Sequence, residues 1–510
     1  MTHPSASLTV SPSRVVGAVN PRLFGSFVEH LGRCVYTGIF EPGHPSADQH
    51  GLRRDDVDLV RELGVTIVRY PGGNFVSGYR WEDGIGPREQ RPSRLDPAWH
   101  VTETNEFGLH EFMDFAAKAG VEPMMAINLG TRGITEALDL VEYCNVPGGS
   151  TWSDLRRANG AEEPFNVRMW CLGNEMDGPW QIGHRTAEDY GYLAARTGAA
   201  LRRLDNRLEL VACGSSSSAM ETFGHWERTV LDRCWDDVTH VSAHAYYEER
   251  DGDVATFLAS SIDMDHFIES VAGAIADVGA SRGDGHHVEI SFDEWNVWYT
   301  NEWTSVEGHQ DIADWPVAPR QLENTYTVTD AVVVGSLLIS LLRHCDVVTS
   351  ACMAQLVNVI APIMTEPGGS AWRQTTFFPF AQTSRLSRGR RVLASELNTP
   401  LVPGGSFGDV PALDAAVVLD DEGGSGAVFV VNRSVEAEMD LALPPSLVPA
   451  GSQVRTRSLW DADRMAANTA ADPTRVGLGP ESQVPVWATG GATLTLPPLS
   501  WTVVEFSRPA

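Results

Sequence analysis

The sequence predicts a (β/α)8 barrel, or TIM barrel, followed by an antiparallel β-sandwich, so the fold class is α/β. Three observations support this prediction. Eight short apolar runs each stop at polar residues, amphipathic segments separate these runs, and beyond about Arg385 helical spacing gives way to short alternating runs. We expect a barrel domain over residues 19–384 and a sandwich over residues 385–510, joined by an N-terminal strand within residues 1–18.

The predicted barrel strands are defined by where their apolar runs stop. A parallel strand is buried on both faces, so it is typically a continuous apolar run with polar residues at its tip. In a barrel of this kind the tips face the site where ligands bind. The runs end near Glu29, Arg69, Asn128, Glu175, Gly214, Tyr246, Glu294 and Gln355.

Amphipathic segments between these runs predict the helices of the barrel. They include Leu109 to Lys118, Ala187 to Leu204, Asp263 to Ala276 and Val328 to Arg343. A doubly wound open sheet is the alternative, but that fold usually carries a Gly-rich phosphate turn after its first strand. The turn here, residues 29–32, is E-H-L-G and lacks that pattern.

The tail alternates apolar and polar residues between Gly, Pro and Asp clusters, which is typical of half-buried strands. The loop D-D-E-G-G-S-G after the first of these runs predicts a hairpin. The predicted strands are Ala415 to Leu419, Ala427 to Val431, Met439 to Leu443, Ala492 to Leu496 and Trp501 to Phe506.

Composition limits the partners and the location of the protein. The formal net charge of -29 argues against nucleic acid and against an anionic membrane surface. The N-terminus lacks the basic start and apolar core of a signal peptide, and the longest apolar run, Ala331 to Leu342, is too short to span a bilayer. We therefore expect a cytoplasmic protein, with its 7 cysteines as buried free thiols.

Two glutamates at predicted strand tips carry the chemistry. Glu175 follows the run Met169 to Leu172 directly after Asn174, and Glu294 follows the run His287 to Phe292. On our count they end the fourth and seventh strands, so their carboxyl groups can face each other across the barrel mouth. Glycosidic bond hydrolysis uses such a pair, one carboxyl to protonate the leaving oxygen and one to act at the anomeric carbon.

Further polar and aromatic residues are expected at the same mouth. Glu29, Arg69, Asn74, His244 and Tyr246 follow apolar runs, so their side chains should converge there. Trp180, Trp298 and Tyr299 suit the apolar face of a sugar ring. His240 and His244 lie on one face of a strand and raise the alternative of a metal, but the chain lacks HExxH, and we expect no metal.

Five long motifs carry a resemblance to a known family. They run through the barrel in order and are similar to those of the α-L-arabinofuranosidases of glycoside hydrolase family 51. The loop 300–320, which we expect to border the leaving-group side, does not match the family. The motifs are FGSFVEHLGRCVY (24–36), RYPGGNFVSGYRWEDGIGP (69–87), LGNEMDGPWQIGH (172–184), DEWNVWY (293–299) and AQLVNVIAPIMT (354–365).

The resemblance implies roles for single residues. It implies a retaining enzyme in which Glu175 is the general acid/base and Glu294 the nucleophile. It also implies an arabinose-containing oligosaccharide as the partner, assembly as a hexamer, and no cofactor or metal. Residues matching positions that bind the sugar or hold the nucleophile are Glu29, Arg69, Asn74, Asn174, Tyr246 and Gln355, with His244, Trp298 and Trp99 in supporting or leaving-group positions.

The mechanism expected from the pair is a double displacement. Two carboxyl groups about 5 Å apart leave no room for a water between nucleophile and sugar, so Glu294 would attack directly. Repulsion between like charges would keep Glu175 protonated for its acid step. The alternatives are a binding protein on a degenerate barrel, a metal-dependent hydrolase, and a glycosidase acting on xylosides or, internally, on glucans; linkage preference stays open.

Overall fold

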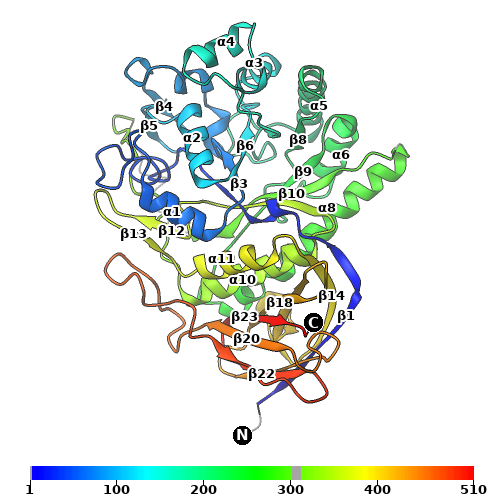
Figure 1. The fold of residues 1–510 in the computed structure, drawn as a ribbon. Helices are drawn as coiled ribbons and strands as arrows, with labels where there is room; N and C mark the ends of the chain where they lie inside the picture. Colours follow the sequence, from blue (N-terminus) through cyan, green and yellow to red (C-terminus); the bar gives the residue numbers. More distant parts are fainter. Residues whose placement is uncertain (1–2, 284, 301–311, 510) are drawn as a thin grey trace.

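The computed structural model describes residues 3–283, 285–300 and 312–509, which form a closed barrel and a separate nine-stranded sheet (Figure 1). The barrel strands are all parallel, in the order β10-β11-β2-β3-β6-β7-β8-β9. The predicted TIM barrel with a C-terminal antiparallel sheet is confirmed. The strands are β2 (Gly25–Phe27), β3 (Ile67–Tyr70), β6 (Glu122–Ala126), β7 (Met169–Leu172), β8 (Glu209–Ala212), β9 (His240–Tyr247), β10 (Glu289–Val297) and β11 (Val348–Met353).

Helices lie between the barrel strands, and the segments predicted from apolar spacing fall on α2, α5, α8 and α10. For α5 and α10 both predicted ends agree with the structure. The helices are α1 (Arg54–Leu63), α2 (Leu109–Ala119), α3 (Ile134–Asn145), α4 (Thr151–Ala158), α5 (Ala187–Leu204), α6 (His225–Cys234), α7 (Val254–Leu258), α8 (Ser260–Arg282), α10 (Val328–Arg343) and α11 (Phe377–Ser387).

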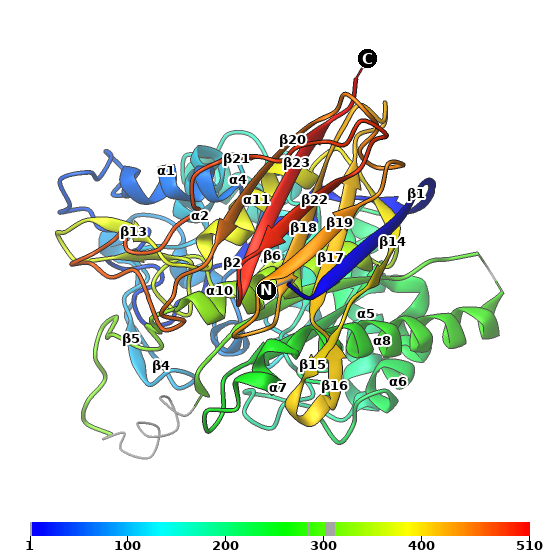
Figure 2. The same ribbon diagram turned by 90° about the horizontal axis from the view of Figure 1, so that it is seen from below.

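Short elements after the barrel strands shape the mouth. The turn η2 (Asn74–Ser77) follows β3, and the hairpin of β4 (Arg94–Asp96) and β5 (Val101–Glu103) lies at the periphery of the barrel in both Figure 1 and Figure 2. The other two-stranded pairs are β12 (Ile363–Thr365) with β13 (Ala371–Arg373) and β15 (Leu401–Pro403) with β16 (Asp409–Pro411).

The second sheet has the order β21-β20-β23-β18-β17-β14-β1-β19-β22 and is antiparallel except where β1 runs beside β19 (Figure 2). Apolar residues from both halves of the sheet, such as Leu8, Val417 and Leu441, share one core. The strands are β1 (Ser5–Ala18), β14 (Arg391–Asn398), β17 (Leu413–Leu419), β18 (Ser425–Asn432), β19 (Met439–Leu443), β20 (Gln453–Leu459), β21 (Ser482–Gln483), β22 (Ala492–Leu496) and β23 (Ser500–Ser507).

Helix α10 forms the joint between barrel and sheet. All its residues except Arg343 are buried, because it packs on α8 and β10 on one side and on β17, β18 and β23 on the other. A Cβ on Gly335 would lie 2.1 Å from Cδ1 of Trp501, so only glycine lets this indole reach the helix. Of the described helices, none is both long and apolar enough to cross a membrane.

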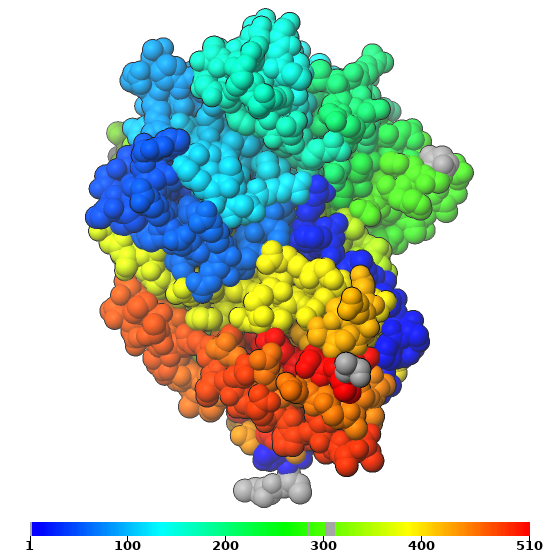
Figure 3. Space-filling model, viewed as in Figure 1, coloured from blue at the N-terminus to red at the C-terminus, as the bar shows by residue number. Residues whose placement is uncertain are grey.

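The predicted division at residues 384 and 385 stays a prediction, because α11 runs across it and packs on both α1 and α10. In the space-filling view, the yellow surface that includes α11 separates the blue and cyan part of the barrel from the orange and red sheet (Figure 3).

Candidate active site

Glu175 reaches the mouth of the barrel through a sharp turn after β7. Every residue of β7 is buried, and Gly173 then takes a φ of 101° that a glycine adopts readily. Glu175 itself has a φ of 41°, a backbone conformation that costs a non-glycine residue about 1 kcal/mol or more. Its carbonyl accepts the N–H of Gly178 at 2.9 Å, which closes the turn.

Glu294 lies inside β10 rather than at its end, so the predicted strand boundary is wrong. The strand continues to Val297 because its pairing with β9 resumes after a register shift between Ser291 and Glu294. Successive side chains of a regular strand point to opposite faces, whereas a shift of this kind re-aims them. Asp293 and Glu294 therefore both face the same cluster of polar groups inside the barrel.

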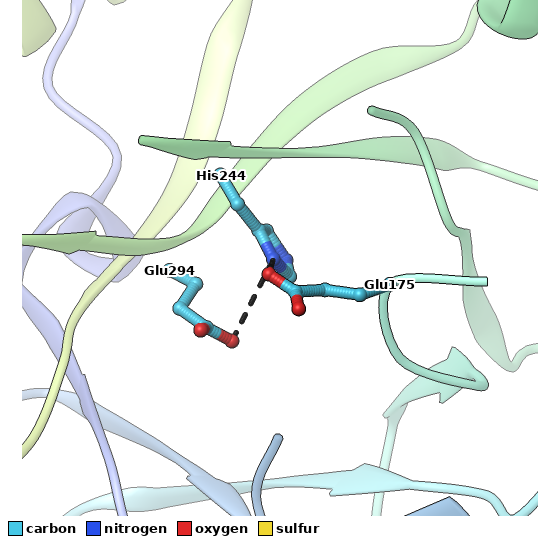
Figure 4. Close-up of side chains that lie close together, drawn as sticks. All are labelled: Glu175, His244 and Glu294. Carbon is cyan, nitrogen blue, oxygen red and sulfur yellow. Dashed lines mark hydrogen bonds and ion pairs between the residues drawn. The ribbon is translucent and has the colours of Figure 1, made fainter. Parts of the chain in front are cut away.

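Three side chains point toward one another in Figure 4: Glu175 from the turn after β7, His244 from β9 and Glu294 from β10. One carboxyl oxygen of each glutamate and one ring nitrogen of His244 all lie within 4.8 Å of one another. All three side chains are buried. The spacing matches that of two carboxyl groups which act on one glycosidic bond without a water between the nucleophile and the sugar.

Both carboxyl oxygens of Glu294 accept hydrogen bonds. Nη1 of Arg69 donates to Oε2 at 3.0 Å, and the hydroxyl of Tyr246 donates to Oε1 at 2.6 Å. Arg69 also donates from Nη2 to the amide oxygen of Asn174 at 2.6 Å, so it links β10 to the turn after β7. Burial raises the pKa of Glu294; the charge of Glu175 adds to this effect, and His244 and Arg69 oppose it.

His244 lies between three carboxylates. Its Nδ1 is 3.0 Å from Oε1 of Glu175, and its Nε2 is 3.0 Å from Oδ1 of Asp293. Burial disfavours the charged ring, yet Glu294, Asp293 and Glu175 outweigh it and raise the pKa of His244 to about 10. The ring is therefore an imidazolium at neutral pH, and both its N–H groups donate.

This charge predicts a pH effect on stability. The pKa of His244 is raised from 6.5 to about 10 on folding, so its stabilising contribution is complete below about pH 6.5 and is lost as pH rises through 10. We expect the melting temperature of the parent to exceed that of His244→Asn most at about pH 6.5, and the difference to shrink as the pH rises to 10. Thermal unfolding at half-unit steps measures it.

The control for this series is His287→Asn, because His287 is an exposed histidine outside the cluster. Its melting temperature should follow that of the parent over the same range. Parallel curves for the parent and His244→Asn would contradict a charged His244.

Glu29 forms another part of the mouth. Its Oε1 accepts from the backbone N–H of Phe75 and from Nε1 of Trp99, both at 2.9 Å, and its Oε2 accepts from Nε2 of Gln355 at 3.0 Å. Burial raises the pKa of Glu29 to about 8, although the hydrogen bonds from Phe75 and Trp99 act to lower it. A Cβ on Gly72 would lie 2.4 Å from Cβ of Glu29, so this glycine lets the turn after β3 pass close to Glu29.

The structure thus brings together most of the residues named from the sequence. The exceptions among those expected at the mouth are Asn74, Trp298 and Tyr299, whose hydroxyl donates to Asp330 at 2.6 Å. Asn74 is half-buried, and its backbone carbonyl, rather than its side chain, accepts from Nε2 of Gln181 at 3.5 Å. Trp298 packs edge-on against the ring of Tyr246, with centroids 5.0 Å apart. Part of the loop 300–320, residues 301–311, lies outside the described residues.

Sequence reasoning missed Asp293 and assigned a different role to Trp180. Asp293 is 1% exposed, and Arg69 and His244 lower its pKa although burial opposes them. Two consecutive acidic residues at one strand tip were the available signal. Trp180, expected to stack on a sugar, instead donates Nε1–H to Oε2 of Glu175 at 2.7 Å while remaining 52% exposed.

The metal alternative based on His240 and His244 does not hold for that pair. Four residues of strand span about 13 Å, too far for two ligands of one ion. Nε2 of His240 instead contacts the hydroxyl of Thr349, at the opposite end of the barrel. Glu175, His244 and Glu294 are placed to hold an ion, and within the described ranges they are the one such group of three.

A TIM barrel with two buried carboxyl groups facing each other across its mouth defines this chain as a glycoside hydrolase of the barrel type. Two family models match it, the α-L-arabinofuranosidase 1 domain over residues 59–265 and the α-L-arabinofuranosidase C-terminal domain over residues 293–500. The chain belongs to the α-L-arabinofuranosidases of glycoside hydrolase family 51.

Individual relatives extend over nearly the whole chain. An intracellular exo-α-(1→5)-L-arabinofuranosidase of Streptomyces lividans is 56% identical over 99% of this chain and 76% of its own length. An exo-α-(1→6)-L-arabinofuranosidase of Bifidobacterium longum is also 56% identical, over 98% of this chain and 96% of its own. The structure of a family 51 enzyme from Bifidobacterium longum superposes with a TM-score of 0.94 at 48% identity, covering 99% of this chain and 100% of that one.

Proposed function

We propose that this protein is a retaining, exo-acting α-L-arabinofuranosidase that removes terminal arabinofuranosyl residues from oligosaccharides derived from arabinoxylan or arabinan. The observation that carries the proposal is the pair Glu175 and Glu294, whose carboxyl oxygens and the ring of His244 lie within 4.8 Å of one another. A separation this short favours direct attack by one carboxylate over activation of a water lying between it and the sugar.

In the first step, a carboxylate oxygen of Glu294 attacks the anomeric carbon and forms an ester. The glycosidic C–O bond breaks, and its oxygen takes a proton from Glu175. Arg69 and Tyr246 orient the attacking carboxylate, since they bind one oxygen each. Arg69 also donates to the amide oxygen of Asn174, and we expect Asn174 to bind the sugar hydroxyl next to the anomeric carbon.

In the second step, Glu175 takes a proton from water, the water oxygen attacks the anomeric carbon, and the ester bond to Glu294 breaks. Both oxygens of Glu175 accept hydrogen bonds here, from His244 and Trp180, which suits the carboxylate form that acts as the base. Protonation for the first step requires one donor to move aside. We expect that donor to be Trp180, because it is half-exposed whereas His244 is also bound to Asp293.

The exo action and the substrate are supported by the relatives. Relatives of equal identity are named for (1→5) and for (1→6) linkages, so overall identity leaves the linkage open. Several relatives are named intracellular, which supports the cytoplasmic location expected from the sequence. Assembly as a hexamer stays a prediction.

The stereochemistry tests the proposal. With 4-nitrophenyl α-L-arabinofuranoside and methanol as acceptor, we expect proton NMR to show methyl α-L-arabinofuranoside as the first product, because two inversions preserve the configuration. The β-anomer as first product would exclude double displacement. A 4-nitrophenyl β-D-xyloside serves as the comparison substrate, and a higher kcat/KM on it would overturn the substrate assignment.

A further inference from the structure

A cavity opens on the same face of the barrel as the two glutamates. Its volume is about 310 Å³, in the range of small-molecule sites. Loops that follow the carboxyl ends of β3, β6 and β7 build it together with the β4–β5 hairpin. We call it the side pocket; the lining residues used below are Phe75, Tyr79, Arg80, Asp96, Asn105 and Ile182.

The walls of the side pocket combine apolar and polar groups. The rings of Phe75 and Tyr79 lie with centroids 4.7 Å apart and are tilted by 36°, and Ile182 contributes an aliphatic surface. Asp96 is 5% exposed, and one of its carboxyl oxygens accepts from the backbone N–H of Ala98 at 3.0 Å. Its other oxygen has no hydrogen-bond partner within the described part of the chain.

Asn105 and Arg80 differ in their access to the side pocket, because Asn105 is buried and Arg80 is exposed. The side-chain amide of Asn105 donates to the carbonyl of Pro92 at 2.7 Å, while its oxygen has no partner among the residues that the structure describes. The guanidinium of Arg80 is exposed and has no hydrogen-bond or ion-pair partner among the described residues. The accessible groups of the side pocket are therefore the guanidinium of Arg80 and the half-buried ring of Tyr79. A donor beside an aromatic ring suits a polyhydroxyl ligand, because a hydroxyl can accept from the guanidinium while the C–H face of the sugar packs on the ring.

The segments that line the side pocket also contact the catalytic groups. Phe75 donates its backbone N–H to Glu29. Asp96 lies three residues before Trp99, which donates to the same carboxylate, so at most about 11 Å of chain separates the two positions. Ile182 lies two residues after Trp180, the donor to Glu175.

The hydrogen bond from Trp180 to Glu175 indicates which end of a bound oligosaccharide would lie near the side pocket. A general acid must lie beside the leaving oxygen, so the leaving-group saccharide extends from the side of Glu175 rather than from that of Glu294. Trp180 and Ile182 belong to this side. A short oligosaccharide that leaves the catalytic pocket past Trp180 therefore comes within reach of the side pocket.

We infer that the side pocket is a sugar-binding subsite for a saccharide unit on the leaving-group side, beyond the unit attached to the cleaved bond, and that it selects among arabinose-containing oligosaccharides. The inference rests on the proposed function. It assigns Arg80 to donate to sugar hydroxyls and the half-buried ring of Tyr79 to pack on the sugar. The unpartnered oxygens of Asp96 and Asn105 are buried behind the cavity wall, and the ring of Phe75 is covered by His30 and Tyr79.

Gly78→Phe tests the subsite by filling it. Gly78 has an ordinary φ of -102°, and an added Cβ would meet nothing nearer than Cδ1 of Ile182 at 3.8 Å. We expect kcat/KM for the arabinose trisaccharide that the parent cleaves best to fall about tenfold, mainly through KM. The value for 4-nitrophenyl α-L-arabinofuranoside, which has no sugar on the leaving-group side, should stay within about twofold.

Gly43→Phe is the matched control, since Gly43 is an exposed glycine with nothing within 4 Å of an added Cβ and lies outside the side pocket. Both of its kcat/KM values should equal those of the parent. Arg80→Ala removes the unpaired cation without adding bulk, and we expect a drop of about threefold on the trisaccharide alone. It keeps the test valid if Gly78→Phe does not fold.

The outcomes separate the two proposals. The measured quantity is the ratio of kcat/KM on the trisaccharide to kcat/KM on the nitrophenyl substrate. If this ratio in Gly78→Phe equals that of the parent, the subsite is overturned, whether the two values stay the same or fall together. If Gly78→Phe does not fold, the same ratio in Arg80→Ala decides. Failure of the parent to cleave the nitrophenyl arabinofuranoside overturns the proposed function instead.

Discussion

Glu294→Ala is expected to lower kcat by about 10⁵-fold or more on every arabinofuranoside, whatever its leaving group. The reason is that formation of the ester intermediate requires this carboxylate, and the loss of a covalent nucleophile affects all substrates alike. Initial rates on 4-nitrophenyl α-L-arabinofuranoside and on an arabino-oligosaccharide measure it. The matched control is Glu289→Gln, at the opposite end of the same strand, whose kcat should stay within about twofold.

Azide distinguishes the role of Glu294 from a purely structural one. In Glu294→Ala the space of the missing carboxylate admits azide on the face from which Glu294 attacks. A single displacement there gives the β-L-arabinofuranosyl azide, which has inverted configuration. Folding is checked by the melting temperature. Full activity of a folded Glu294→Ala, or azide product of retained configuration, would contradict the nucleophile assignment.

Glu175→Ala is expected to act selectively. For oligosaccharides, whose leaving groups need a proton, kcat/KM should fall by about 10³- to 10⁴-fold, the size of a general acid's contribution. For a dinitrophenyl arabinofuranoside it should fall far less, because that leaving group departs without protonation. The second step still lacks its base, so we expect a burst of phenol followed by a slow steady state.

Azide should restore turnover of Glu175→Ala on the dinitrophenyl substrate, because it attacks the ester intermediate without needing a base. Attack comes from the face vacated by the leaving group, so the product should be the α-L-arabinofuranosyl azide, with retained configuration. Glu188→Ala, an exposed glutamate on α5, is the control and should behave like the parent. Equal loss on both substrates with no azide response would exclude Glu175 as the acid/base.

The sequence predicted the barrel and its rim because both follow from local chemistry. A strand buried on both faces must be apolar throughout, so runs such as Met169–Leu172 were visible without any knowledge of their neighbours. Helices α5 and α10 were predicted to the residue for a similar reason, since one or more faces of each must be apolar. In the second sheet, β14, β20 and β21 were not predicted. The exposed and half-buried residues of β20 and β21 leave little apolar signal.

The features that the sequence did not predict depend on distant residues. The register shift in β10 arises from its pairing with β9 and β11, and it is what brings Asp293 into the cluster beside Glu294. The charge on His244 depends on carboxylates from β10 and from the turn after β7, none of which is its neighbour in sequence. Trp180 contacts Glu175 only because the chain between them turns sharply.

By itself the sequence determined the fold class, the two glutamates and most of the residues around them, because periodicity and strand-tip position are local properties. Only the tertiary structure decided how close those carboxyl groups lie, which group holds the charge between them, and that segments near residues 78, 96, 105 and 182 enclose the side pocket. Distances and electrostatic potentials between residues far apart in the chain exist only once the strands have closed into a barrel.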